Sequence, residues 1–147
     1  MTHYVSSGLA AHLANTGSMK SALDGGFIDI YSGPVPADAD AALGTATRLC
    51  RVSLDSTATG LTLVADGRFL RKNPGDSWTG TKEASGTATF YRHVEDGDDG
   101  SASTTAKRLQ GAVGLTNAAE MTLVDVVFTA GGTFPLNNYV LEQPTYG

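Results

Sequence analysis

The densest cluster of side chains that could do chemistry is the acidic turn Asp96-Gly97-Asp98-Asp99-Gly100. Carboxylates on a glycine-rich turn suit Ca²⁺, because this hard cation takes oxygen ligands. The calcium loop of an EF-hand, however, ends on a glutamate, and the matching position counted from Asp96 is Lys107. We therefore interpret the cluster as a solvated turn in which glycine supplies positive φ angles, and we expect no metal ion and no other cofactor.

The remaining reactive side chains show no catalytic spacing. His3, His12 and His93 are the only histidines, and none pairs with another at a metal-ligand spacing. His93 follows aromatic residues on a predicted strand, where we expect it at the surface or at a sheet edge. Cys50 is the single cysteine, so its expected role is that of a small buried apolar side chain. Since no nucleophile elbow, phosphate-binding loop or dinucleotide fingerprint occurs, we expect the protein not to be an enzyme.

Aromatic side chains offer candidates for contact with a partner. An exposed Trp78 could stack on a sugar ring, whereas a buried Trp78 would cover one end of the core, and we favour the buried role. Phe90 and Tyr91 are adjacent on a predicted strand, so their side chains point to opposite faces. One of the two must leave the core face, and we single out Tyr91 as a candidate partner contact.

Composition limits the class of protein. Of the 147 residues, 41% are hydrophobic and 17% are charged, which suits one folded domain and excludes a disordered chain. The net charge is -5 and the basic residues are scattered, so we expect no binding to nucleic acid. No apolar run approaches the length of a membrane helix, and the first residues lack the pattern of a signal peptide. We therefore expect no membrane association and synthesis in the cytoplasm.

Two short helices are predicted near the N-terminus. Ser7 can cap a helix over residues 8–14, and a further turn or two is expected over residues 18–23 before a glycine-containing turn. Helices this short persist only through tertiary contacts. We therefore treat residues 1–26 as an N-terminal helical segment, either packed on the domain or reaching a neighbouring subunit as an arm, ahead of a β-sandwich domain at 27–147.

The rest of the chain alternates short apolar runs with glycine, serine and threonine, which is typical of an all-β sandwich or barrel. A long loop over residues 32–43 contains Pro34 and Pro36, which prevent regular strand pairing there. The predicted fold is a two-sheet antiparallel sandwich, with a jelly roll as first choice and an immunoglobulin-like sandwich as second. The predicted strands cover residues 27–31, 47–54, 61–65, 68–71, 77–82, 86–94, 107–113, 120–128 and 133–142.

Two local patterns add detail to this prediction. Alternation along the first strand places Asp29 on the face opposite to Ile28 and Ile30. The dipeptide Asp66-Gly67 between two apolar runs predicts a hairpin with a two-residue turn.

Three segments together resemble a known family. They are GFIDIYSG at 26–33 leading into PADAD at 36–40, GTATFYR at 86–92, and KRLQGAVG at 107–114 running into 124–139. In this order they are similar to small proteins of tailed bacteriophages that are encoded near the major capsid protein. Some of those proteins are cement or decoration proteins with a jelly-roll fold. The resemblance implies a structural virion protein on the capsid surface, made in the cytoplasm of the host bacterium, that bridges subunits of the major capsid protein.

We expect the loops and the N-terminal segment to carry the contacts with the capsid protein, because binding residues concentrate in loops on a rigid scaffold. The candidate partner-binding residues are Leu9, Leu13, Met19, Pro34, Val35, Pro36, Trp78 and Tyr91. We also expect a homo-oligomer, with a dimer as first choice and a trimer as second. The alternatives are an accessory protein of the phage neck or tail, and a carbohydrate-binding module that uses Trp78.

Overall fold

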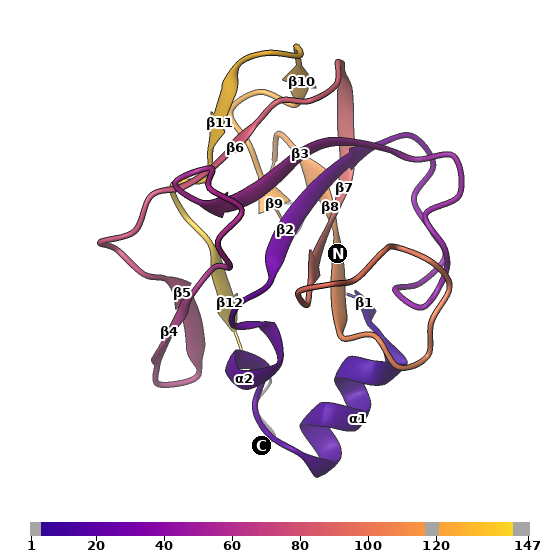
Figure 1. Ribbon diagram of the computed structural model, residues 1–147, viewed down its shortest axis with the longest axis vertical. Coiled ribbons are helices and arrows are strands. Elements are labelled where there is room, and N and C mark those ends of the chain that lie inside the picture. The colour runs from indigo at the N-terminus through magenta and orange to yellow at the C-terminus, as the bar shows by residue number, and fades with distance from the viewer. Residues whose placement is uncertain (1–3, 117–120, 143–147) are drawn as a thin grey trace.

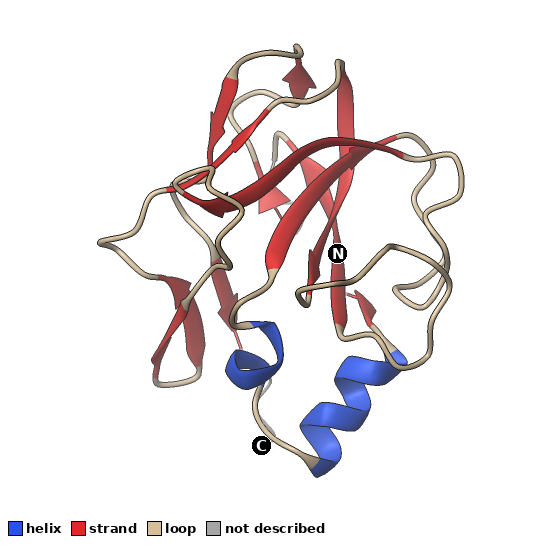
Figure 2. Ribbon diagram, viewed as in Figure 1, coloured by secondary structure: helices blue, strands red, loops and turns tan. Residues whose placement is uncertain are grey.

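The computed structural model describes residues 4–116 and 121–142, and β-strands dominate it (Figure 1). Within these residues, strands form a nine-stranded and a three-stranded sheet, accompanied by two short helices. Figure 2 shows both helices at one end of the molecule and long loops running beside the strands. The arrangement agrees with the predicted all-β class and with a sandwich of two sheets.

The two predicted helices are present, and both pack on the strands. In α1 (Ser7–Asn15), the capping residue is Ser6 and not the predicted Ser7. The Oγ of Ser6 accepts a hydrogen bond from the backbone N–H of Leu9 at 3.1 Å. A capping box begins α2 (Met19–Leu23). Leu9 and Leu23 are fully buried in the same core as the strand residues. The N-terminal segment is therefore part of the packed domain.

The larger sheet is antiparallel except for one short pair. Its continuous series runs in the order β1 (Tyr4–Val5), β8 (Arg108–Gly114), β7 (Gly86–Val94), β2 (Phe27–Ser32), β3 (Thr47–Leu54), β6 (Trp78–Thr81) and β11 (Thr133–Pro135). Two further strands attach to this series: β10 (Val127–Phe128) pairs with β7, and β9 (Met121–Thr122) pairs in parallel with β8. Because β2 and β7 lie in the interior of the sheet, both of their faces are available for burial.

The smaller sheet consists of β12 (Val140–Glu142), β5 (Phe69–Lys72) and β4 (Leu63–Asp66), in that order. Strands β4 and β5 form the predicted hairpin, but its turn lies one residue later than predicted. Asp66 pairs with Phe69, so the turn is Gly67-Arg68, and Gly67 has a φ of 60°. The first position of such a turn requires a positive φ, which glycine adopts without strain.

The long interior strands match their prediction, and the C-terminal ones do not. The predicted strands 47–54 and 86–94 coincide with β3 and β7. The predicted strand 133–142 is divided, because β11 ends at Pro135, which has no N–H for further pairing. The chain then crosses to the smaller sheet, where β12 pairs with β5. The predicted strand 120–128 contains only the short β9 and β10, and its first residue lies outside the described ranges.

The main apolar core lies on one face of the larger sheet. Ile28 and Ile30 of β2 belong to it, together with Trp78 and Tyr139. Asp29 lies on the opposite face, as the alternation of the strand predicts. This opposite face, called the outer face below, is also buried, and it carries the candidate site.

Candidate functional site

A row of polar side chains crosses the outer face of the larger sheet. The polar row consists of Arg51, Asp29, Arg92 and Gln110, which are successive pairing partners on β3, β2, β7 and β8. Directly paired residues place their side chains on the same face. Asp29, Arg92 and Gln110 are at most 2% exposed. Buried polar groups require hydrogen-bond partners, and two loops supply many of them.

The loop between β2 and β3, residues 33–46, is held against the polar row by its own backbone carbonyl groups. Nη2 of Arg92 donates to two of them at 2.8 and 3.3 Å, Nε2 of Gln110 donates to a third at 3.0 Å, and Nη1 of Arg108 donates to a fourth at 3.1 Å. The accepting carbonyl groups are those of Ala41, Asp38, Pro36 and Ala39, in that order. The sheet thus satisfies the backbone of a loop that has no regular secondary structure.

The loop between β7 and β8, residues 95–107, is anchored by a buried ion pair. Nε and Nη2 of Arg108 donate to the two carboxylate oxygens of Asp98 at 2.6 and 2.7 Å, and both side chains are at most 2% exposed. Burial alone would raise the pKa of the Asp98 carboxyl, but bonds from Arg108 and from the backbone of Gly100 outweigh burial and lower that pKa. The prediction of a wholly solvated acidic turn is therefore wrong for Asp98, because an arginine of the next strand binds its carboxylate.

Asp40 connects the two loops with α1. Its carboxylate accepts hydrogen bonds from the hydroxyl and the backbone N–H of Ser7, the second at 2.7 Å, and these bonds lower the pKa of Asp40. Its backbone carbonyl accepts a bond from the N–H of Ser103 at 2.9 Å. Residues 33–46 and 95–107 are therefore cross-connected, and we call them together the loop layer.

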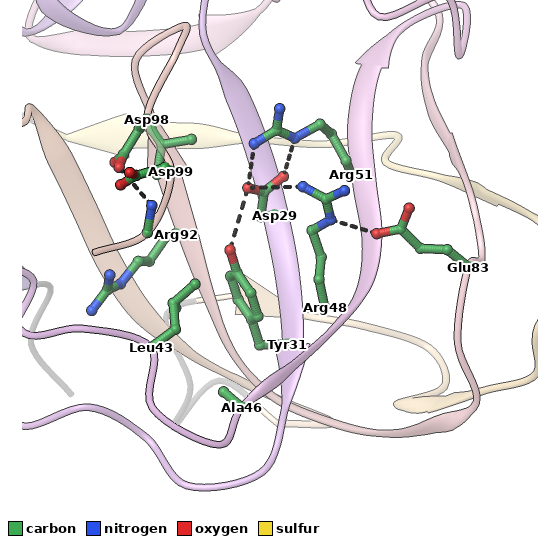
Figure 3. Close-up of a pocket in the computed structure, with 12 residues that line it drawn as sticks. Asp29, Tyr31, Leu43, Ala46, Arg48, Arg51, Glu83, Arg92, Asp98 and Asp99 are labelled. Carbon is green, nitrogen blue, oxygen red and sulfur yellow. Dashed lines mark hydrogen bonds and ion pairs between the residues drawn. The ribbon is translucent and has the colours of Figure 1, made fainter. Parts of the chain in front are cut away.

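A pocket of about 300 Å³ opens where the loop layer meets the polar row (Figure 3). Arg51 donates to both oxygens of Asp29 at 2.8 Å, and the partly exposed Arg48 forms an ion pair with Glu83. The hydroxyl of Tyr31 donates to Asp29 at 3.4 Å. Burial, and then the charge of Asp29, raises the pKa of Tyr31, so this hydroxyl stays protonated.

Arg92 also lines the pocket, but its guanidinium group is turned away from Arg48 and Arg51 (Figure 3). It is only 1% exposed, yet its partners are neutral oxygens: Oε1 of Gln110 at 2.9 Å and the two loop carbonyls. Within the described part of the chain, its Nη1 has no hydrogen-bond partner. Burial, and then the charge of Arg108, lowers the pKa of Arg92.

Five of the predicted partner-binding residues are accessible, in two separate groups. Pro34, Val35 and Pro36 begin the loop layer, and Val35 is 49% exposed. Leu13 and Met19 line a groove between the helices and the β4–β5 hairpin, and Leu13 is 37% exposed. The structure does not bring the two groups together into one surface.

Three other predicted contacts are corrected by their burial. Leu9, Trp78 and Tyr91 are at most 1% exposed, so their side chains belong to the interior and not to a partner-binding surface. The ring of Trp78 packs against that of Tyr139, with centroids 5.8 Å apart, which confirms the buried role that we favoured. A sugar-stacking tryptophan would need an exposed ring face, and this one has none.

The aromatic pair Phe90 and Tyr91 on β7 shows why the predicted exposure of Tyr91 is wrong. Phe90 and Tyr91 point to opposite faces, but both are buried. Tyr91 joins the core, and Phe90 stacks on Tyr31 of the outer face with centroids 4.9 Å apart. The polar row and the loop layer bury the outer face, so the residue that leaves the core face still does not reach the surface.

His93 is also misplaced by the sequence prediction. It is 0% exposed, because β7 is an interior strand and the side chain packs against Tyr139 on the core face of the sheet. Its Nδ1 forms a hydrogen bond with the hydroxyl of Tyr139 at 3.0 Å. Burial lowers the pKa of His93 to about 4, so this imidazole is neutral near pH 7.

Arg92, Arg108 and Gln110 are not among the predicted site residues, although the sequence contains a signal for them. Arg108 and Gln110 alternate with Leu109 along a predicted strand, which places them on one face. Arg92 follows two aromatic residues on another long strand. Polar side chains at alternate positions of long strands indicate a face that another part of the chain can cover.

Other chemistry-bearing side chains have ordinary surroundings. Cys50 is a free, buried cysteine, and burial raises the pKa of its thiol to about 12. Among the described residues, no three histidine, cysteine, aspartate or glutamate side chains are grouped so that they could hold a metal ion. In the same part of the chain, no helix combines the length and the apolar character needed to cross a membrane.

Comparisons with known proteins give no match to a family model, to a curated protein or to a solved structure. The resemblance to bacteriophage proteins therefore stays a prediction from the sequence. The function has to be argued from the loop layer, the pocket and the exposed residues beside them.

Proposed function

We propose that this chain is a non-catalytic structural protein that decorates the exterior of a bacteriophage capsid by bridging subunits of the major capsid protein. The jelly-roll topology and a homo-oligomeric state belong to the same proposal. The observation that carries it is the loop layer, a binding surface without regular structure that buried arginines hold on a rigid sheet. The sequence resemblance supplies the identity of the partner.

A fixed loop is a favourable contact surface, because little conformational entropy remains to be lost on binding. Pro34 and Pro36 restrict the backbone at the start of the loop layer, and the carbonyl of Pro36 is held by Gln110 at 3.0 Å. Between the two prolines, Val35 is 49% exposed. This rigid tip presents an apolar side chain that a capsid surface can cover.

Bridging requires a second contact surface, and the groove beside the helices provides a candidate. It has a volume of about 290 Å³, and Leu13, Met19, Phe69 and Leu70 contribute apolar side chains to it. The groove lies between the N-terminal helices and the β4–β5 hairpin, whereas Val35 lies on the loop between β2 and β3. Two separate surfaces allow one copy to contact two capsid subunits.

Each contact can be modest and still stabilise a shell. A protein that binds the assembled state and not the free subunits shifts the equilibrium towards assembly by mass action. Two linked contacts on a lattice also gain avidity, because the second forms at a high effective concentration. A small domain with two weak surfaces is therefore sufficient for this function.

Point substitutions test the two surfaces on heads that lack the protein. Val35→Asp and Leu13→Asp each place a charge in a proposed apolar contact, so each should weaken binding at least about tenfold. Val64→Asp is the matched control, because Val64 is 37% exposed on β4 outside both groups. Deleting the N-terminal segment would not be informative, since Leu9 and Leu23 belong to the core. Unchanged binding of both test variants, confirmed as folded, would remove the proposed surfaces.

A further inference from the structure

Strand β4 forms one edge of the smaller sheet, because among the described strands it pairs only with β5. Leu63 of β4 is the pairing partner of Lys72 of β5. The N–H of Leu63 donates to Oδ1 of Asp24 at 2.8 Å, on the side away from β5. The N–H of Lys72 donates to the carbonyl of Tyr139 at 2.9 Å, on the side away from β4. Leu63 and Lys72 are therefore a non-hydrogen-bonded pair of the antiparallel ladder, whose backbone groups point away from each other.

The edge of β4 is open at Ala65. Backbone groups of alternate residues in a strand point to the same side, so the N–H and C=O of Ala65 point to the free edge, as those of Leu63 do. Ala65 is exposed, and within the described chain no hydrogen bond engages its N–H or C=O. An unpaired donor and acceptor on an edge strand can pair with another chain. Asp24 occupies the edge at Leu63 and the turn begins at Gly67, so the opening is confined to Ala65.

Ala65 also lines the apolar groove between the hairpin and the helices. Leu13 and Met19 contribute the helical wall of this groove. The edge of β4 faces α2, because Asp24, the C-cap of that helix, bonds with Leu63. A strand added beside Ala65 would therefore lie between β4 and the helices, and alternate side chains of that strand would point into the groove.

The two charged side chains that line the groove are both basic. They are Lys20 and Arg68, and no carboxylate is among the described lining residues. Their ion-pair partners, Asp24 and Glu142, lie outside the lining, and the side chains of Arg68 and Glu142 are 50% and 55% exposed. Exposed pairs contribute little, so a carboxylate of a ligand can replace Glu142 at Arg68. In a protein with a net charge of -5, this basic rim favours an acidic ligand.

We propose that an extended segment of a partner protein, carrying an apolar side chain and a nearby acidic one, binds this groove by adding a strand to β4 at Ala65. In this mode of recognition, main-chain hydrogen bonds provide affinity and pockets for alternate side chains provide specificity. The inference states how the second contact surface of the proposed function works, and it rests on that function for the identity of the partner. Binding of a peptide to the groove does not depend on that identity.

A displayed library of random ten-residue peptides, enriched on the full-length protein, provides the probe. We expect the enriched peptides to share alternating apolar residues and a glutamate or aspartate, and calorimetry with synthetic copies measures their affinity. The backbone of one such peptide is then N-methylated at one residue at a time. Methylation at the residue opposite Ala65 should weaken binding about fivefold or more, and methylation at either neighbour should leave binding unchanged, because alternate N–H groups of an added strand face β4.

Ala65→Pro should weaken peptide binding by a similar factor, because proline lacks the N–H, and edge strands tolerate proline where the N–H points outwards. The matched control is Val140→Pro at the opposite edge of the same sheet. The carbonyl of Tyr139 bonds with Lys72, so the N–H of the next residue, Val140, points away from β5. This control should bind peptides as the unaltered protein does.

The proposal is wrong if the library yields no binding peptide, if no single N-methylated position weakens binding, or if Ala65→Pro and Val140→Pro bind equally well. The N-methylation series uses the unaltered protein, so it decides the question even if Ala65→Pro does not fold. A second arm measures binding of Ala65→Pro to heads that lack the protein. Weakened binding supports an extended segment of the capsid protein in the groove, and unchanged binding excludes it. A failure of the proposed capsid function would instead abolish head binding of the unaltered protein and leave peptide binding unaffected.

Discussion

Arg108 and Asp98 form a buried bidentate ion pair, with N–O distances of 2.6 and 2.7 Å. Arg108 also donates to the backbone carbonyls of Ala39 at 3.1 Å and Ser101 at 2.6 Å. One side chain of β8 therefore holds both loops of the loop layer. The position of that layer, and with it the proposed binding surface, depends on this charge pair.

Asp98→Asn should destabilise the fold by about 3–5 kcal/mol, because it leaves the charge of Arg108 buried without its partner. The free energy of unfolding in urea measures the effect. Asp66→Asn is the control: it breaks the ion pair between Asp66 and Arg71, whose side chains are 69% and 42% exposed. Exposed pairs contribute little, so the control should change stability by less than about 1 kcal/mol. Equal effects of the two substitutions would show that the buried pair does not hold the loops.

Protonation of His93 should make the fold less stable in mild acid. Its pKa is lowered from 6.5 to about 4 by burial, so below about pH 6.5 the unfolded state takes up a proton that the native state does not. Stability is therefore complete above pH 6.5 and decreases as the pH falls to about 4, by about 3 kcal/mol in total. Between pH 7 and 4, the free energy of unfolding should depend much less on pH in His93→Gln than in the unaltered protein. The control His12→Gln should keep the pH dependence of the unaltered protein. An unaltered slope in the His93 variant would contradict this interpretation.

Gly8→Ala should destabilise the protein by about 1–3 kcal/mol, because a Cβ there would lie 2.2 Å from the carbonyl oxygen of Thr105 in the loop layer. In an exposed helix the same change would stabilise by up to about 1 kcal/mol. The sign of the change in thermal midpoint thus reports whether α1 is pressed against the loop. Ala10→Gly, on the exposed side of α1, gives the ordinary helix-propensity effect for comparison. A stabilising Gly8→Ala would contradict the close packing.

The protein is expected to self-associate at least on its target, as a dimer first and a trimer second. Strand β1 is a sheet edge whose Tyr4 and Val5 are 47% and 42% exposed, and exposed apolar edges favour pairing between chains. Sedimentation analysis measures association in solution, and Val5→Lys should reduce it. The expectation would be wrong if the protein is monomeric in solution and if its copies on a decorated particle are isolated, away from any symmetry axis.

Local sequence patterns predict the elements of this fold better than they predict its outer layer. The alternation of Ile28, Asp29 and Ile30 and the hairpin near Gly67 depend on neighbouring residues, and both are confirmed. The burial of Arg92 and Phe90 depends on a loop whose path is set by tertiary hydrogen bonds. Alternating polar residues indicate that this face can be covered, but they do not identify residues 33–46 as the segment that covers it.

Electron microscopy of particles decorated with the purified protein is the most direct test of the proposed function. Added to phage heads that lack it, the protein is expected to give density on the outer capsid lattice, with the loop layer around Val35 against one capsid subunit and the groove around Leu13 against another. Density on the neck or tail would indicate an accessory protein of those structures. Density at neither place would contradict a structural role in the virion.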